Sequence, residues 1–296
     1  MLRDILDRYR NVLLVVGAVG VGLSVPFFGP YLEPLVTPLV IFLVFSSLRG
    51  LEFGKIDVSS YASLVVLSLC ISYVVLPVAG IRLADGVLAD GAVLGFAIAL
   101  AVPTTAGSAI IWTRLTQGDV QLATITSISS LLVAPVVTPI VLLQLVGSGA
   151  EVPVDSILID LIVIVGGGTV LAAGLPADVV SPRTIDLGAT VAILLLIYTS
   201  VAGVEPTGIS AWVLLAVVGV SALLVVLGLL VSLVCERALQ LSRRQTLALF
   251  FTGSLKNLGI ALLIALAYPD PLVVLSIITY YVVQQLSGAA ISDAVG

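Results

Sequence analysis

Long apolar runs alternate with short polar segments along the whole chain of 296 residues. The runs extend for roughly 18–25 residues, the length that an α-helix needs to cross the hydrocarbon core of a membrane, and they lack the residue-by-residue alternation of barrel strands. The pattern therefore predicts an all-α polytopic membrane protein. Ten transmembrane helices are expected, at 12–28, 31–48, 60–82, 91–117, 120–146, 156–175, 185–203, 210–235, 245–268 and 272–291.

Two of these runs are interrupted near their middles by small, polar and helix-breaking residues. In the fourth run, Pro103 and Gly107 accompany the hydroxyls of Thr104, Thr105 and Ser108. In the ninth, the break is expected over 253–257, and its polar side chains are Thr252, Ser254, Lys256 and Asn257. Irregular backbone at membrane depth is tolerated only where it is buried in protein or lines a cavity. The two breaks are thus predicted to meet and to form a substrate or ion site.

The breaks lie roughly half the chain apart, and Gly147-Ser148-Gly149 separates two sets of five runs. Discontinuous helices at matching places in two repeats are typical of secondary transporters. The chain is expected to consist of two inverted five-helix repeats, 1–148 and 149–296. Half-helix N-termini would bring partial positive charge to the crossing, and freed carbonyls would offer ligands to a cation.

Composition supports a membrane location. Hydrophobic residues make up 60% of the chain and charged residues 10%, against about 25% charged in soluble domains. With ten spans, ten basic residues fall on the side of the termini and only Arg82 on the other, and the positive-inside rule makes the basic side cytoplasmic. A multi-pass protein of the cell membrane with both termini in the cytoplasm is expected. The basic residues on that side are Arg3, Arg8, Arg10, Arg49, Lys55, Arg114, Arg183, Arg237, Arg243 and Arg244.

Lys256 is the only charge deep inside a predicted span. A charge at that depth is energetically expensive and is usually functional. Three roles are open from the sequence: a fixed cation in place of a bound metal ion, a titrating proton carrier, or a direct partner for a substrate carboxylate. Elsewhere, the fifth span carries a hydroxyl-rich face that is typical of helix packing. Ser127 on that face is a candidate site residue, and Gln284 and Gln285 in the tenth span could reach the crossing.

Three short motifs resemble the bile acid:sodium symporter family. Residues 117–122, continuing to Ala134-Pro135-Val136-Val137-Thr138-Pro139, resemble the family's R-G-N-x-x-L…S-P-x-x-T-P signature. Lys256-Asn257-Leu258-Gly259 resembles Q-N-S-G, and Gln285-Leu286-Ser287-Gly288 resembles N-x-S-G. The resemblance covers essentially the whole chain. It implies a core domain of spans 3–5 and 8–10, a panel domain of spans 1, 2, 6 and 7, and alternating access between them.

The chain departs from this family at the positions that resemble its sodium ligands. A glutamate of the family falls at Thr252, a glutamine at Lys256 and another glutamine at Ser72. The family's Ser-Asn pair falls near Ala109 and Ile110, and a serine falls at Ala123, while Ser127 keeps a hydroxyl. Oxygen-rich coordination of a hard cation is poorly supported by this set. The resemblance therefore implies a built-in ammonium where sodium is usually bound, and leaves sodium as the alternative coupling ion.

The expected function is secondary transport of a small organic anion. A cation/proton antiporter with crossed helices is an alternative, but it needs a mid-membrane carboxylate that the breaks lack. A carrier that uses Lys256, either proton-coupled or uncoupled, is another. The chain contains no histidine, and no nucleophile–base pair is evident, so neither an enzyme nor a metal or organic cofactor is expected. No basic patch suits nucleic acid. The expected partners are the anionic substrate and the lipid bilayer, and no oligomeric state is predicted.

Overall fold

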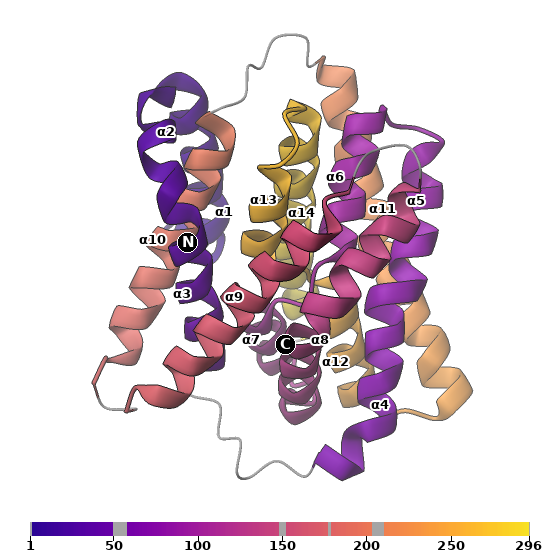
Figure 1. Cartoon of the computed structure of the whole chain (residues 1–296). Helices are drawn as coiled ribbons and strands as arrows, with labels where there is room; N and C mark the ends of the chain where they lie inside the picture. The colour runs from indigo at the N-terminus through magenta and orange to yellow at the C-terminus, as the bar shows by residue number, and fades with distance from the viewer. Residues whose placement is uncertain (1, 50–57, 148–151, 177–178, 203–209, 296) are drawn as a thin grey trace.

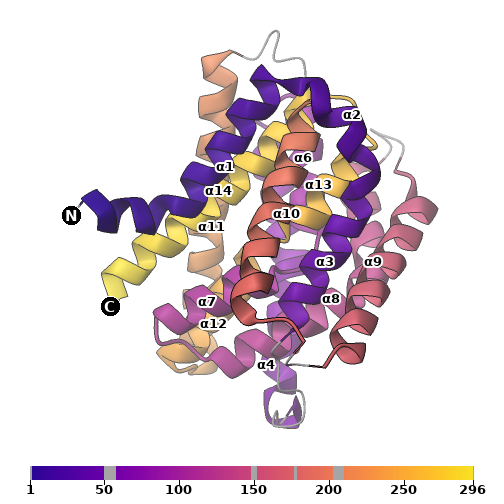
Figure 2. The same cartoon turned by 90° about the vertical axis from the view of Figure 1, so that its left-hand side faces the viewer.

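A computed structural model describes residues 2–49, 58–147, 152–176, 179–202 and 210–295 of the chain. Over these residues the secondary structure is helical, apart from one isolated backbone bridge. The helices pack side by side in a bundle, and most run roughly along its long axis (Figures 1 and 2). The prediction of an all-helical membrane protein is confirmed.

The helices of the first half are α1 (Leu2–Ser24), α2 (Gly29–Leu32), α3 (Val36–Leu48), α4 (Val58–Cys70), α5 (Leu76–Asp85), α6 (Asp90–Ala101), α7 (Ala106–Leu115) and α8 (Val120–Val146). Those of the second half are α9 (Val154–Gly174), α10 (Pro182–Ala202), α11 (Ala211–Leu239), α12 (Arg243–Ser254), α13 (Leu258–Ala265) and α14 (Pro271–Val295). Two 3-10 turns flank α2, and a π-helical turn, Ile71–Val75, joins α4 to α5.

Seven described helical segments are long and apolar enough to cross a membrane: Pro26–Leu48, Ser60–Asp85, Val120–Val146, Val154–Gly174, Pro182–Ala202, Ala211–Leu239 and Pro271–Ala294. They correspond to seven of the expected spans. The other three runs give shorter pieces, because the apolar part of α1 is only Leu13–Ser24 and the fourth and ninth runs are each split in two. A multi-pass membrane protein is established, while the count of ten spans and the inverted repeats stay predictions.

Local sequence explains where several helices begin. The Asp119 carboxylate accepts a hydrogen bond from the Leu122 amide at the start of α8. Ser242 and Gln245 form a reciprocal capping box at the start of α12. The Asn257 side chain accepts from the Ile260 amide and so begins α13. Each cap satisfies backbone donors that the first turn of a helix leaves free.

Both predicted breaks are present, but they are narrower than expected. The first covers 102–105, because Val102, which precedes Pro103, is extended and the helix resumes at Ala106. The second covers 255–257, with Leu255 extended. The prediction that these breaks include Gly107, Ser108, Gly253 and Ser254 is wrong. In the first case the helix resumes at Ala106 and includes Gly107 and Ser108, and in the second the helix continues through Gly253 to Ser254.

The two breaks cross each other. Thr104 and Lys256 form an antiparallel bridge. The Thr105 amide donates to the Leu255 carbonyl over 3.2 Å, and the Asn257 amide donates to the Pro103 carbonyl over 2.9 Å. Each break therefore supplies hydrogen-bond partners for the other, which is how interrupted backbone is kept satisfied away from water. The expectation that the breaks meet is confirmed.

Small residues allow several helices to approach closely. At Gly95 in α6, a Cβ atom would lie 2.5 Å from the Val273 carbonyl oxygen of α14. At Gly168 in α9, it would lie 2.4 Å from a methyl group of Val44 in α3. Close approach at small residues is typical of membrane helices. Around these contacts, α3 packs on α9 and α10, and α10 on α1. The division into core and panel domains stays a prediction.

Candidate functional site

Lys256 lies at the crossing with its ammonium group fully engaged. The side chain is 3% exposed. Its Nζ donates to the Ser72 carbonyl over 2.7 Å, to the Ser72 hydroxyl over 2.8 Å and to the Val102 carbonyl over 3.3 Å. It also lies 5.0 Å from the centre of the Tyr73 ring, within reach of a cation–π interaction. A lysine ammonium has three donors, and all three are used here.

The Ser72 carbonyl is available because the helix is irregular at this point. In the π-helical turn Ile71–Val75, the Leu76 amide donates to the Ile71 carbonyl. The next residue, Pro77, has no N–H to give. The Ser72 carbonyl is thus left without either of its usual helical donors, and Lys256 takes their place. Single π-helical turns are frequent at functional sites.

A hydrogen-bond network fixes the backbone around Lys256. The Thr104 amide donates to the Ser130 hydroxyl over 3.0 Å, and the Thr104 hydroxyl donates to the Thr252 carbonyl over 2.6 Å. The hydroxyl of Tyr73 donates to the Ser130 carbonyl over 2.9 Å, and Ser130 donates to Tyr73 over 3.1 Å. The hydroxyls of Ser68 and Thr252 lie 2.7 Å apart. Four segments of the chain are therefore tied to the crossing by buried bonds.

The N-terminal ends of two half-helices face one cavity. This cavity has a volume of about 400 Å³. Thr105 and Ser108, at the start of α7, line it, and so do Asn257 and Gly259 at the start of α13. Helix N-termini carry partial positive charge and free amide donors, so they favour negatively charged groups. The remaining walls are mixed, with apolar side chains, several hydroxyls and the carboxylate of Asp186.

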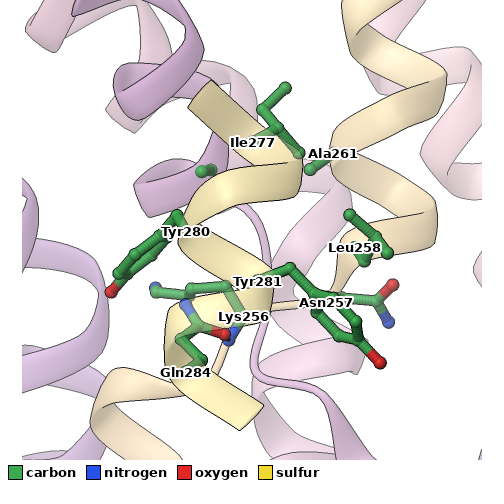
Figure 3. Close-up of a pocket in the computed structure, with 9 residues that line it drawn as sticks. Lys256, Asn257, Leu258, Ala261, Ile277, Tyr280, Tyr281 and Gln284 are labelled. Carbon is green, nitrogen blue, oxygen red and sulfur yellow. The ribbon is translucent and has the colours of Figure 1, made fainter. Parts of the chain in front are cut away.

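A much smaller cavity lies beside the backbone of Lys256 (Figure 3). Its volume is about 10 Å³, which is the size of a single water molecule. Gln284 lines it, accepting from the Lys256 amide through Oε1 over 3.2 Å. The Nε2 of Gln284 is buried and has no protein partner among the described residues. A bound water would satisfy this donor.

The nine site residues predicted from the sequence fall into three groups of three. Thr104, Thr252 and Lys256 come together at the crossing, while Thr105, Ser108 and Asn257 line the larger cavity. The third group is Gln285, Ser127 and Ser254, and none of their side chains hydrogen-bonds to the crossing. Gln285 accepts from the Trp112 indole and donates to Ser108, so it joins α14 to α7. The hydroxyls of Ser127 and Ser254 are buried without a partner among the described residues.

Sequence reasoning did not select Tyr73, Ser130 or Ser68 as site residues, and it noted Ser72 only through the family resemblance. One signal for Ser72 was present in the chain. Pro77 lies five residues after Ser72 inside an apolar run, and a proline there frees a carbonyl toward the site. Tyr73 and Ser130 have no such signal, because buried hydroxyls inside apolar runs usually serve packing.

A family model described as the SBF-like CPA transporter family matches residues 11–295. The match covers nearly the whole chain, so the chain belongs to this family. It is therefore a membrane transporter, in agreement with the helical fold and its apolar spans. The resemblance to bile acid:sodium symporters that the motifs indicated is confirmed. A comparison with curated proteins found no match.

Proposed function

We propose that the protein is a secondary transporter that carries a small organic anion across the cell membrane by alternating access. The arrangement of the larger cavity supports this. Two half-helix N-termini face it, and they offer free amides and partial positive charge to an anionic group. Apolar residues such as Leu43, Ile111 and Ile193 line other parts of the same cavity. A substrate with one acid group and an apolar body fits such walls.

One carboxylate narrows the substrate class further. Asp186, near the start of α10, lines the cavity. A second acid group on the substrate would meet like charge there, and like charges at close range repel. The proposal therefore favours a monoanion over a dianion.

The proposed mechanism rests on the oxygen atoms that surround the ammonium group of Lys256. Two carbonyls and a hydroxyl converge on its ammonium at 2.7 to 3.3 Å. Such oxygens are the ligands that hard cations prefer. The ammonium thus takes the place of a bound sodium ion as a tethered positive charge, and transport needs no sodium. A buried-carboxylate antiporter is less favoured, because Lys256 is the only charged residue among the buried side chains described.

The position of the cavity also supports the proposal that the protein is in an inward-facing conformation. Its lining includes Ser46 and Ser47 near the end of α3, and Asp186 near the start of α10. Arg49 and Arg183, two of the basic residues that the positive-inside rule places in the cytoplasm, lie close by in sequence. The cavity is therefore on the cytoplasmic side, and the described conformation is inward-facing.

Uptake of labelled carboxylates into proteoliposomes tests the coupling. The full chain is expected to accumulate or exchange a monocarboxylate at the same rate with sodium or with potassium as the only cation. Dicarboxylates of similar size are expected to be poorer substrates. Uptake that disappears when sodium is removed would contradict the role proposed for Lys256.

A second prediction tests whether the larger cavity is the substrate site. Gly107 lines it, and a Cβ atom at this position would meet nothing within 4 Å. A Gly107→Leu variant is thus expected to fold normally while its side chain fills part of the cavity. Uptake should fall by at least about tenfold, because a blocked site loses its contacts with substrate.

The matched control is Gly166→Leu in α9. This glycine also has nothing within 4 Å of a Cβ atom, but it does not line the cavity. The control should transport normally, and both variants should elute as the parent does in size-exclusion chromatography. Equal uptake by Gly107→Leu and the parent would place the substrate elsewhere.

A further inference from the structure

A second polar cavity lies at the end of the bundle where α7 ends and α12 begins. Its volume of about 530 Å³ exceeds the 400 Å³ of the cavity proposed for the substrate, from which it is separate. Arg114, in the last turn of α7, and Arg243 and Arg244, in the first turn of α12, line it together with Thr116 and Gln117. The two helices lie side by side in both views of the bundle (Figures 1 and 2). The substrate mechanism proposed above uses none of these residues.

Among the residues that the structure describes, no ion pair neutralises the three arginines. In the ranges that the structure describes, their guanidinium groups make no hydrogen bond or ion pair, and no acidic residue lines the cavity. The nearest carboxylate in sequence is Asp119, whose Oδ1 caps α8 by accepting from the Leu122 amide and whose own amide donates to the Arg244 carbonyl over 2.9 Å, but it forms no ion pair with the arginines. Arg49, on the same side of the membrane, differs: its guanidinium donates to the Leu175 and Pro176 carbonyls.

The position of the arginines on α12 is electrostatically unfavourable. Arg243 and Arg244 are the first two residues of the helix, and the first turn contains no acidic residue. Cations are disfavoured at a helix N-terminus because that end already carries partial positive charge. The positive-inside rule explains why basic residues occur on this side. It does not explain why three of them surround one hollow, where they repel each other.

We infer that this cavity binds a phosphate group, supplied by the headgroup of an anionic phospholipid or by phosphate in solution. Guanidinium groups bind phosphate oxygens in a bidentate geometry, and the first-turn amides of α12 that the Ser242–Gln245 capping box does not use add further donors. Basic clusters at the cytoplasmic ends of membrane helices attract anionic headgroups. A phosphate held here would cancel the repulsion and connect α7 to α12, one half of each crossing helix.

Thermal unfolding of the purified full chain tests this site. One arm compares nanodiscs of phosphatidylcholine with nanodiscs that also contain phosphatidylglycerol. The other compares potassium phosphate with potassium chloride in phosphatidylcholine nanodiscs at matched ionic strength, because salt alone screens surface charge. The midpoint of unfolding is expected to rise in at least one arm. A rise only with phosphatidylglycerol identifies the headgroup as the source, and a rise with inorganic phosphate identifies the free ion.

The variants are Arg114→Gln and the double variant Arg243→Gln/Arg244→Gln. Each should weaken the apparent affinity for the phosphate probe by about tenfold or more, since each removes charge-assisted hydrogen bonds. Arg183→Gln and Arg237→Gln are the matched controls, because all five arginine side chains are exposed but these two do not line the cavity. They should keep the parent's rise. No rise in either arm for the parent, or an equal loss in the control variants, would overturn the inference.

Discussion

Replacing Lys256 by glutamine is expected to lower sodium-free uptake by at least about tenfold. The substitution removes the tethered charge and its hydrogen bonds to Ser72 and Val102, and hydrogen bonds to charged groups contribute about 1.5–3 kcal/mol each. It also leaves oxygens at the crossing with fewer donors. If the ammonium stands in for sodium, added sodium should partly restore uptake in this variant and leave the parent unchanged. Initial rates across a series of sodium concentrations and pH values measure both effects.

The matched control is Arg82→Gln, which also removes one positive charge. Arg82 lies in the last turn of α5, and its exposed side chain does not touch the crossing. Its uptake should match that of the parent. Loss of uptake without rescue by sodium, but with a changed pH profile, would favour Lys256 as a proton carrier. Unchanged uptake by Lys256→Gln at every sodium concentration and pH would remove the residue from the mechanism altogether.

The largest effect on stability is expected from Gly95→Ala. A methyl group at this position would lie 2.5 Å from the Val273 carbonyl oxygen and 3.1 Å from its Cα atom. These are backbone atoms, so the clash is relieved only if α6 and α14 move apart. Overpacking of this kind costs about 1–3 kcal/mol. The midpoint of thermal unfolding in detergent should fall by several degrees relative to the parent.

Gly166→Ala provides the comparison, because a Cβ atom there meets nothing within 4 Å. Alanine is favoured over glycine inside a helix by roughly 0.8–1.0 kcal/mol, so this variant should be as stable as the parent or slightly more stable. A Gly95→Ala protein that unfolds at the parent's temperature would show that α6 and α14 do not pack as closely as described.

Much of the architecture was predictable because membrane helices leave a strong signal. A long apolar run has few alternatives to a helix in lipid, so the seven long apolar spans could be placed from the sequence. The breaks were visible for the same reason, since Pro103, Lys256 and Asn257 do not suit the middle of a span. The residues at which each break begins and ends were harder to predict, because glycine and serine occur both in helices and in loops. The breaks therefore extend less far than the composition of the sequence indicated.

The partners of Lys256 could not be predicted in the same way. Its ligands are mostly backbone carbonyls, and any residue carries a carbonyl. Which carbonyls are free depends on the π-helical turn at Ile71–Val75 and on how helices distant in sequence pack together. Gln285 shows the opposite case. Its motif suggested the crossing, but a neighbouring indole and hydroxyl engage both ends of its amide. Gln285 is held by these contacts between α14 and α7, and contacts between helices so far apart in the sequence could not be predicted from the position of the motif.

The reciprocal bonds between the two breaks have a consequence for biosynthesis. Pro103 and Thr105 emerge from the ribosome long before Leu255 and Asn257, yet each pair completes the backbone hydrogen bonding of the other. Until the second break arrives, the first has polar backbone groups at membrane depth without these partners, which costs several kcal/mol per group. The first half of the chain can therefore enter the membrane early but cannot reach its final form alone. A protein truncated before Leu255 should be a substrate for membrane quality control.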